Sequence, residues 1–234
     1  MDEFNSRRWG AYAGIAFVVL IIVSYLVFLV GGGAPPSVQD TSKFADYMAS
    51  HVGRVAAFAW IGSVAFVVLL PFIVSVRQVL RAARGDWEWP AGVAFAAGIS
   101  FAVLALVHFA LYAAAIIDTT VKGDPAALKA LFLAGAVIGG TIQWLAAALV
   151  MVGVSYAILQ TGVLPRWTAW VGFVAAGLNL VSSLSLFGGG ETNGFFTATG
   201  FVGFIFGDLP FGVWVASVSI VMLGAPEGRR SRAA

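Results

Sequence analysis

The sequence predicts an all-α membrane protein, a single domain over residues 1–234 built as a polytopic bundle of six transmembrane helices. Hydrophobic residues make up 60% of the chain and charged residues only 10%, whereas charged residues are about a quarter of a soluble domain. Six apolar runs each exceed the roughly 17 residues that cross the hydrocarbon core as a helix. Charged residues are almost confined to the segments between these runs, as expected of membrane spans.

The six runs define the predicted spans. They are Trp9–Val30, Val55–Leu80, Ala91–Ile117, Leu128–Leu159, Trp167–Phe187 and Thr199–Leu223. The first follows Arg7 and Arg8, like a signal peptide, but it is longer than the usual apolar region of about 7–15 residues. We therefore expect it to be retained as the first helix.

A short external amphipathic helix is predicted between the first and second spans, within residues 31–53. Glycines and prolines at the start of this segment end the first helix, and Thr41 or Ser42 is a suitable N-cap for the next one. Apolar side chains then recur at three- and four-residue spacing, at Phe44, Tyr47, Met48 and Val52. This spacing gives a helix one apolar face. We expect that face to pack on lipid or on the bundle.

The distribution of charge predicts the orientation. Nine of the 13 basic residues lie on the side of the membrane that holds both termini: Arg7, Arg8, Arg77, Arg81, Arg84, Arg166, Arg229, Arg230 and Arg232. Tryptophans that suit a membrane interface fall at the same boundary: Trp9, Trp87, Trp89, Trp167 and Trp170. By the positive-inside rule, both termini are expected in the cytoplasm and the protein in the plasma membrane.

Small residues predict close helix packing in three places. Pairs of glycines four residues apart occur at Gly10 and Gly14, Gly135 and Gly139, and Gly203 and Gly207. Each pair leaves a stretch of one helix face without side chains, so the backbone of a neighbouring helix can approach closely. We expect contacts within the bundle rather than between copies of the chain.

Two ionisable residues inside the spans, His108 and Asp208, form the centre of the candidate site. An ionisable side chain in hydrocarbon costs several kcal/mol unless it is paired or hydrated. Each of the two is nine residues from the outer end of its span, or about 14 Å along a helix. At equal depth they are expected to meet.

Further polar residues near this level extend the candidate site to Tyr112, Gln143 and Asn179. Pro210 removes a backbone donor from the last span, so carbonyl groups near it need other partners. Two interpretations follow. Either the five polar residues form a ligand-binding or proton-responsive site, or they hydrogen-bond between helices and hold the bundle together.

The sequence predicts no catalytic residue, metal site or cofactor, and we do not expect an enzyme. There is no cysteine and only two histidines, so a zinc centre would need carboxylates. Motifs for phosphate binding, zinc proteases and nucleophilic serines are missing. Basic residues lie in short connections rather than in a patch, which argues against nucleic acid. The expected partners are the lipid bilayer and a protein partner or a second copy of the chain.

Several short motifs resemble a bacterial membrane-protein family, domain of unknown function 4386. They are Ala34–Ser37, Phe44–Tyr47 with His51, the arginine-rich turn after the second span, Asp124–Leu131 and Gly162–Trp167. The resemblance implies a six-helix integral membrane protein and supplies no functional residues. We expect an accessory or interaction protein, with a small-solute or proton-linked carrier or receptor as the alternative.

Overall fold

The computed structural model describes residues 3–30, 35–82, 88–121, 123–189 and 194–224. These residues are helical or lie in turns, and none of them forms a strand. Within these ranges, six helical segments are long and apolar enough to cross a membrane. The predicted all-α bundle of six spanning helices is confirmed, and the chain is a multi-pass membrane protein.

The spans agree with the predicted ones to within a few residues at most boundaries. They are α1 (Glu3–Leu29), α3 (Val52–Arg81), α4 (Glu88–Thr120), α5 (Pro125–Val137) continued by α6 (Gln143–Thr161), α7 (Arg166–Ser183) and α8 (Leu209–Gly224). The first span begins at Glu3, well before the predicted Trp9. A 3₁₀ segment, η2 (Leu184–Gly188), ends the fifth span, and the sixth begins at Gly203 rather than Thr199, because residues 195–201 form turns.

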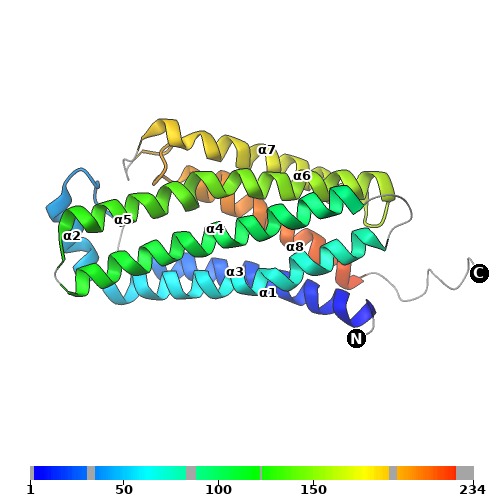
Figure 1. Ribbon diagram of the computed structural model, residues 1–234, viewed down its shortest axis with the longest axis horizontal. Helices are drawn as coiled ribbons and strands as arrows, with labels where there is room; N and C mark the ends of the chain where they lie inside the picture. The colour runs from blue at the N-terminus through cyan, green and yellow to red at the C-terminus, as the bar shows by residue number, and fades with distance from the viewer. Residues whose placement is uncertain (1–2, 31–34, 83–87, 122, 190–193, 225–234) are drawn as a thin grey trace, which may run out of the picture.

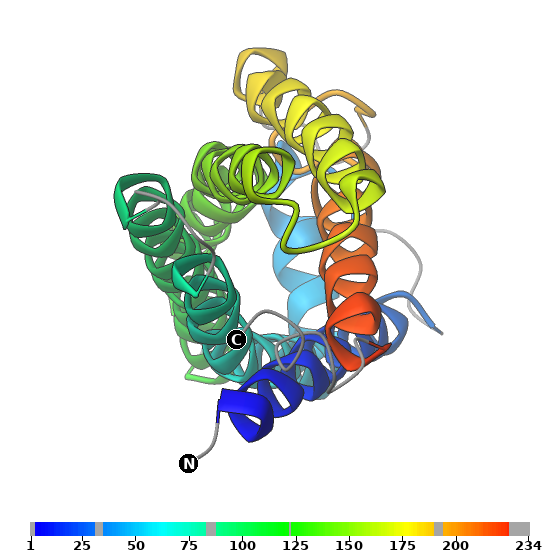
Figure 2. The same ribbon diagram turned by 90° about the vertical axis from the view of Figure 1, so that its right-hand side faces the viewer.

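The spans form a closed ring in which each helix packs against the next one along the chain. Figure 1 shows the helices running side by side along the long axis, and Figure 2 shows the ring from the end where α1 begins. Contacts join α1 to α3, then α3 to α4, α4 to α6, α6 to α7 and α7 to α8, and α8 returns to α1. The first and last spans therefore close the bundle.

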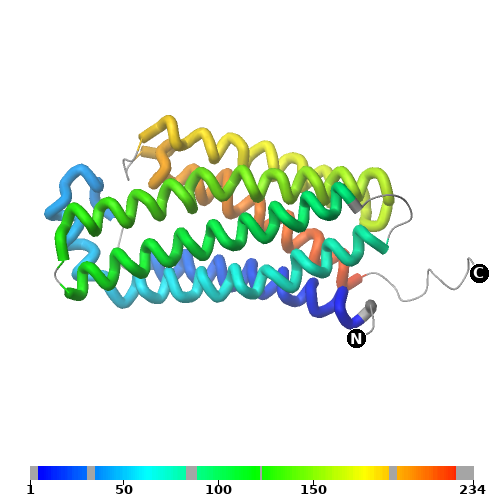
Figure 3. Tube along the Cα trace, in the orientation of Figure 1, coloured from blue at the N-terminus to red at the C-terminus, as the bar shows by residue number. Residues whose placement is uncertain are grey.

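Two spans contain a π-helical turn. The segment η1 (Ile138–Ile142) joins α5 to α6 without breaking the helical path, as the tube in Figure 3 shows, and η3 (Gly203–Asp208) leads into α8. An ideal Cβ on Gly203 would lie 3.8 Å from the carbonyl oxygen of Gly140, so the two segments approach closely. A π turn widens the helix and changes which backbone carbonyls find a donor, and such turns often occur at functional sites.

The predicted external helix is α2 (Thr41–Ser50), and it packs on the bundle. Its buried residues are Phe44 and Met48, and the Phe44 ring meets that of Phe132 of α5 at 4.9 Å between centroids. The N-cap is Asp40, not Thr41 or Ser42, because the Asp40 carboxylate accepts from the backbone N–H of Lys43. Hydrogen bonds from Lys43 lower the pKa of Asp40 to about 2. The cap is therefore complete above about pH 4 and is lost as the pH falls towards 2.

The three glycine pairs make contacts within the bundle, as predicted. Gly10 lies against Ser75 of α3, and Gly14 against Ser219 of α8. The other two pairs lie against residues of the candidate site and of the core. Gly135 faces Tyr112, Gly139 faces His108, Gly203 faces Gly140 and Gly207 faces Trp144.

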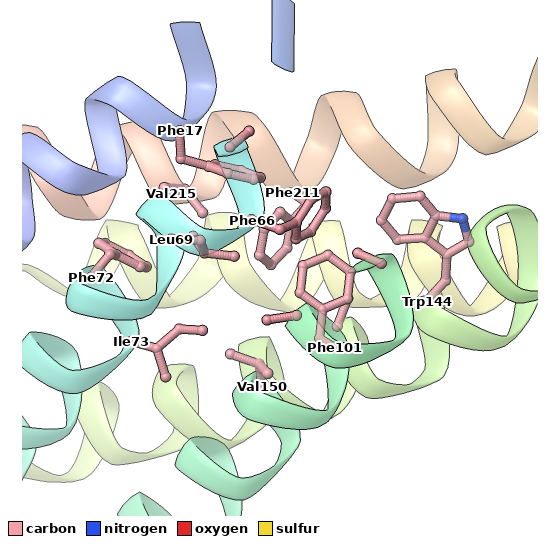
Figure 4. Close-up of a cluster of buried hydrophobic side chains, with 14 of the residues drawn as sticks. Phe17, Phe66, Leu69, Phe72, Ile73, Phe101, Trp144, Val150, Phe211 and Val215 are labelled. Atoms are coloured by element: carbon pink, nitrogen blue, oxygen red, sulfur yellow. The ribbon is translucent and has the colours of Figure 1, made fainter. Parts of the chain in front are cut away.

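Aromatic side chains fill the centre of the ring. Phe101 lies between Phe66, Phe211 and Trp144, with ring centroids 4.6–5.9 Å apart (Figure 4). Phe17 adds a contact from α1 to both Phe66 and Phe211. Offset and edge-to-face pairs of this kind add about 0.5–1.5 kcal/mol each beyond their burial.

Replacing Gly207 by alanine is expected to destabilise the bundle, because the new Cβ would lie 2.4 Å from a ring carbon of the fully buried Trp144. Overpacking of this kind costs about 1–3 kcal/mol. The measurement is the melting temperature of the detergent-solubilised protein, which should fall by several degrees. Gly212→Ala is the control, since its Cβ meets nothing within 4 Å. Equal melting temperatures for the two variants would contradict the assigned contact between η3 and α6.

Candidate functional site

The structure gives His108 and Asp208 separate partners. His108 Nδ1 lies 2.8 Å from the carbonyl oxygen of Gly135 on α5, and because a carbonyl only accepts, Nδ1 carries the hydrogen in this bond. The Asp208 carboxylate accepts from the hydroxyl of Tyr25 on α1 at 2.5 Å. Both residues are among those described, and no ion pair joins them. The expectation of direct contact was wrong.

A continuous row of contacts nevertheless links the two residues. The row runs Asp208, Tyr25, Phe58, Tyr112, His108. Its ring-to-ring distances are 5.8 Å for Tyr25 and Phe58, 6.2 Å for Phe58 and Tyr112, and 4.3 Å for Tyr112 and His108. The row crosses the bundle from η3 through α1 and α3 to α4. The equal depth inferred from the sequence is compatible with this arrangement, but aromatic side chains occupy the space between the ionisable groups.

Tyr25 is the residue of the site that sequence reasoning missed. It carries the only hydroxyl that bonds to Asp208 among the described residues, and its neighbour Ser24 donates to the Phe58 carbonyl at 3.0 Å. The signal was present, because Ser24 and Tyr25 are adjacent polar residues in an otherwise apolar span.

Two glycines create the space in which His108 lies. An ideal Cβ on Gly139 would lie 2.2 Å from His108 Nδ1, and one on Gly135 would lie 2.7 Å from the Tyr112 ring. Any larger residue at either position would displace one of these rings. Gly135 and Gly139, the pair that predicted close packing, therefore also leave room for the His108 imidazole to reach the Gly135 carbonyl.

Asn179 of α7 bonds the backbone that Pro210 disrupts. In an α-helix the carbonyl of residue 206 would accept from the N–H of residue 210, and proline has none. Asn179 Nδ2 instead donates to the carbonyl oxygens of Phe206 at 3.0 Å and Gly207 at 3.2 Å. The carbonyl freed by the proline thus receives a donor from another helix. Asn179 is fully buried, so no other donor from solvent replaces this one.

Several buried polar atoms near the π turns have no hydrogen-bond partner among the described residues. They include Gln143 Oε1, Asn179 Oδ1, and the hydroxyls of Ser182 and Ser185. Asn179, Ser182 and Ser185 are three residues apart and share one face of the fifth span. By contrast, the exposed Ser100 and the half-buried Ser183 donate to carbonyls of their own helices. Free hydrogen-bonding capacity among the described residues therefore lies inside the bundle, around Asn179 and Gln143 and also at Ser155, Trp214 and Ser219.

The chemistry available at the site is hydrogen bonding and proton exchange. Within the described ranges, no three histidine or acidic residues come close enough to hold a metal ion. Comparison with known proteins adds no assignment: no protein-family model, curated protein or solved structure matches the chain.

Asn179→Leu is expected to destabilise the protein by about 1–3 kcal/mol, the cost of leaving a buried carbonyl unpaired. Adding Pro210→Ala should reduce this loss by about 1 kcal/mol or more, since alanine restores an N–H for the Phe206 carbonyl. A double-mutant cycle on unfolding in detergent measures the coupling. Ser183→Ala, one turn away, serves as the control, because Ser183 is half-buried and bonds only to the Leu180 carbonyl of its own helix. A loss from Asn179→Leu that is the same with and without Pro210 would refute the compensation.

Proposed function

We propose that this chain is an accessory or interaction protein of the bacterial plasma membrane whose intramembrane polar residues hold the helices together. The observation that supports the proposal is that hydrogen bonds inside the membrane join different segments of the bundle. His108 bonds to α5, Asp208 bonds to α1, and Asn179 bonds to η3. Each of these polar groups therefore bonds to a different segment of the bundle.

This use of polar groups has a physical reason. Helices in lipid gain little from burying apolar surface against each other, so interhelical hydrogen bonds and close packing stabilise the bundle. The bond from Asp208 to Tyr25 joins the first and last spans, where the ring closes. The bond from His108 fixes α4 against α5. In a structural role, His108 and Asp208 each hydrogen-bond to a neighbouring helix.

A proton-linked or small-solute carrier or receptor is the second candidate. It is favoured by the unpaired acceptors Gln143 Oε1 and Asn179 Oδ1, which lie beside two π-helical turns. His108 and Asp208 are only partly buried, so each retains some accessible surface. In this alternative, a polar solute would donate hydrogen bonds to the two unpaired acceptors. A proton would exchange at His108 or Asp208, the residues at the two ends of the row of contacts.

We further propose membership of the family of domain of unknown function 4386, and cytoplasmic termini. The orientation is supported by position as well as by charge. Trp9, Trp89 and Trp167 are exposed at the end of the bundle where α1, α4 and α7 begin. Exposed tryptophan at one end of a bundle favours the headgroup region. Arg77 and Arg81 lie at the same end, and Trp87 is outside the described residues.

Removing the Asp208 bond is expected to weaken the bundle. Asp208→Leu and Tyr25→Phe should each lower the melting temperature by a few degrees, and their coupling should be about 0.6–1.5 kcal/mol. Thermal unfolding of the single and double variants measures the coupling. The matching test is to melt wild type, His108→Leu and Asp208→Leu between pH 5 and 8, roughly the range in which histidine titrates. A pH-dependent shift that vanishes in both variants would overturn the structural role and support the carrier.

The orientation can be tested by cysteine labelling, because the natural chain has no cysteine. Ser50→Cys at the end of α2 and Ala82→Cys just after α3 place single exposed thiols at opposite ends of the bundle. In intact cells, an impermeant maleimide should label only the Ser50 variant, and both variants should react after the membrane is opened. Labelling of Ala82→Cys alone in intact cells would reverse the orientation.

A further inference from the structure

An arginine without a counter-ion lies at the contact between α3 and α4. Arg77 is half-buried, and the part of the chain that the structure describes offers no ion pair to its guanidinium and no hydrogen bond to its buried Nε. The guanidinium carbon lies 4.5 Å from the centre of the Phe95 ring, which stabilises the cation but accepts no conventional hydrogen bond. A charge at the edge of a membrane is costly unless an anion or water pairs with it.

Arg77 lies at the lipid-facing edge of α3. Its neighbours on the helix surface are three and four residues away. Val74 and Arg81 are exposed. Ile73 is buried against α4, where an ideal Cβ on Gly98 would lie 2.9 Å from its side chain. The enclosed space on the inner side of Arg77 is only about 20 Å³, which holds about one water. A larger anion can therefore reach the guanidinium only from the lipid side.

The outer groove between α3 and α4 changes from polar to apolar along its length. The two helices run antiparallel, side by side in Figure 1, and Arg77 lies level with Phe95. Arg81 is one turn nearer the end of α3, and the exposed Trp89 is about 9 Å nearer the start of α4. Guanidinium and indole groups both favour the headgroup region of a membrane. In the opposite direction along the groove, the exposed residues are small and apolar: Val67, Val74, Ala96 and Val103.

We propose that this groove binds an anionic phospholipid of the phosphatidylglycerol type, with its phosphate on Arg77 and its acyl chains along the outside of α3 and α4. The planar guanidinium offers parallel N–H donors, a geometry suited to a phosphate. The small apolar residues deeper along the groove suit acyl chains. Arg8 and Arg81 lie at the same end of the bundle, so the local charge favours an anionic headgroup over one that also carries an ammonium group.

The test is competition between two lipids for the full-length protein in non-ionic detergent, measured by native mass spectrometry. From an equimolar mixture, the wild-type protein is expected to retain phosphatidylglycerol about fivefold more often than phosphatidylethanolamine, the preference expected of one arginine at a membrane surface. Arg77→Gln should reduce this ratio to about one, and Arg77→Lys should retain most of it because the charge remains. Arg166→Gln is the matched control, since Arg166 is exposed at the start of α7 and outside the groove. This variant should leave the ratio unchanged.

The comparison in the wild-type protein needs no variant, so it tests the proposal even if Arg77→Gln does not fold. Equal retention of the two lipids would overturn the proposal, as would an unchanged ratio in Arg77→Gln. Equal losses in Arg77→Gln and Arg166→Gln would also overturn it, because the preference would then come from the charge of the whole end of the bundle.

A soluble anion distinguishes a lipid site from a site for free phosphate. Glycerol 1-phosphate carries the anionic group without acyl chains, so millimolar concentrations should leave the retention of phosphatidylglycerol unchanged. Displacement of the lipid by glycerol 1-phosphate would show that the groove binds a soluble anion, and the proposal would be wrong.

Discussion

The bundle depends on the requirement that backbone and side-chain polar groups inside a membrane find partners within the protein. Lipid supplies no donor or acceptor, so each break in a helix has to be repaired by another helix. Pro210 imposes this requirement most clearly, because it leaves the Phe206 carbonyl without its helical donor. The repair comes from Asn179 on α7. One local irregularity of the sixth span therefore fixes the position of the fifth.

Close packing by glycine makes these repairs possible. Gly139 leaves room for the His108 ring, and Gly207 leaves room for Trp144. Without the first gap, α4 could not bring an imidazole to the Gly135 carbonyl, and without the second the sixth span could not approach α6 so closely. Hydrogen bonding and close packing therefore act together at His108, whose bond to Gly135 forms beside the missing Cβ of Gly139.

The sequence predicted the spans because hydropathy and length are one-dimensional properties, and a helix in lipid is the required backbone form. It also predicted the need for a partner for the carbonyls near Pro210, and Asn179 was among the residues named. It did not predict the pairing of Asp208. Depth along a helix can be computed from residue number, but the direction of a side chain around the bundle depends on the neighbouring helices. Asp208 and His108 share a region of the bundle and face different neighbours, Tyr25 and Gly135.

The two ends of the bundle solve different physical problems. Towards the α2 end, the row from Asp208 to His108 joins four segments by the Tyr25–Asp208 hydrogen bond and by edge-to-face and tilted ring contacts, and α2 covers part of that end through Phe44. At the end where α1 begins, Arg77 lies over the Phe95 ring, with its guanidinium carbon 4.5 Å from the ring centroid. Close to the headgroup region this arginine can reach the interface, so its charge costs less there than at the bilayer centre.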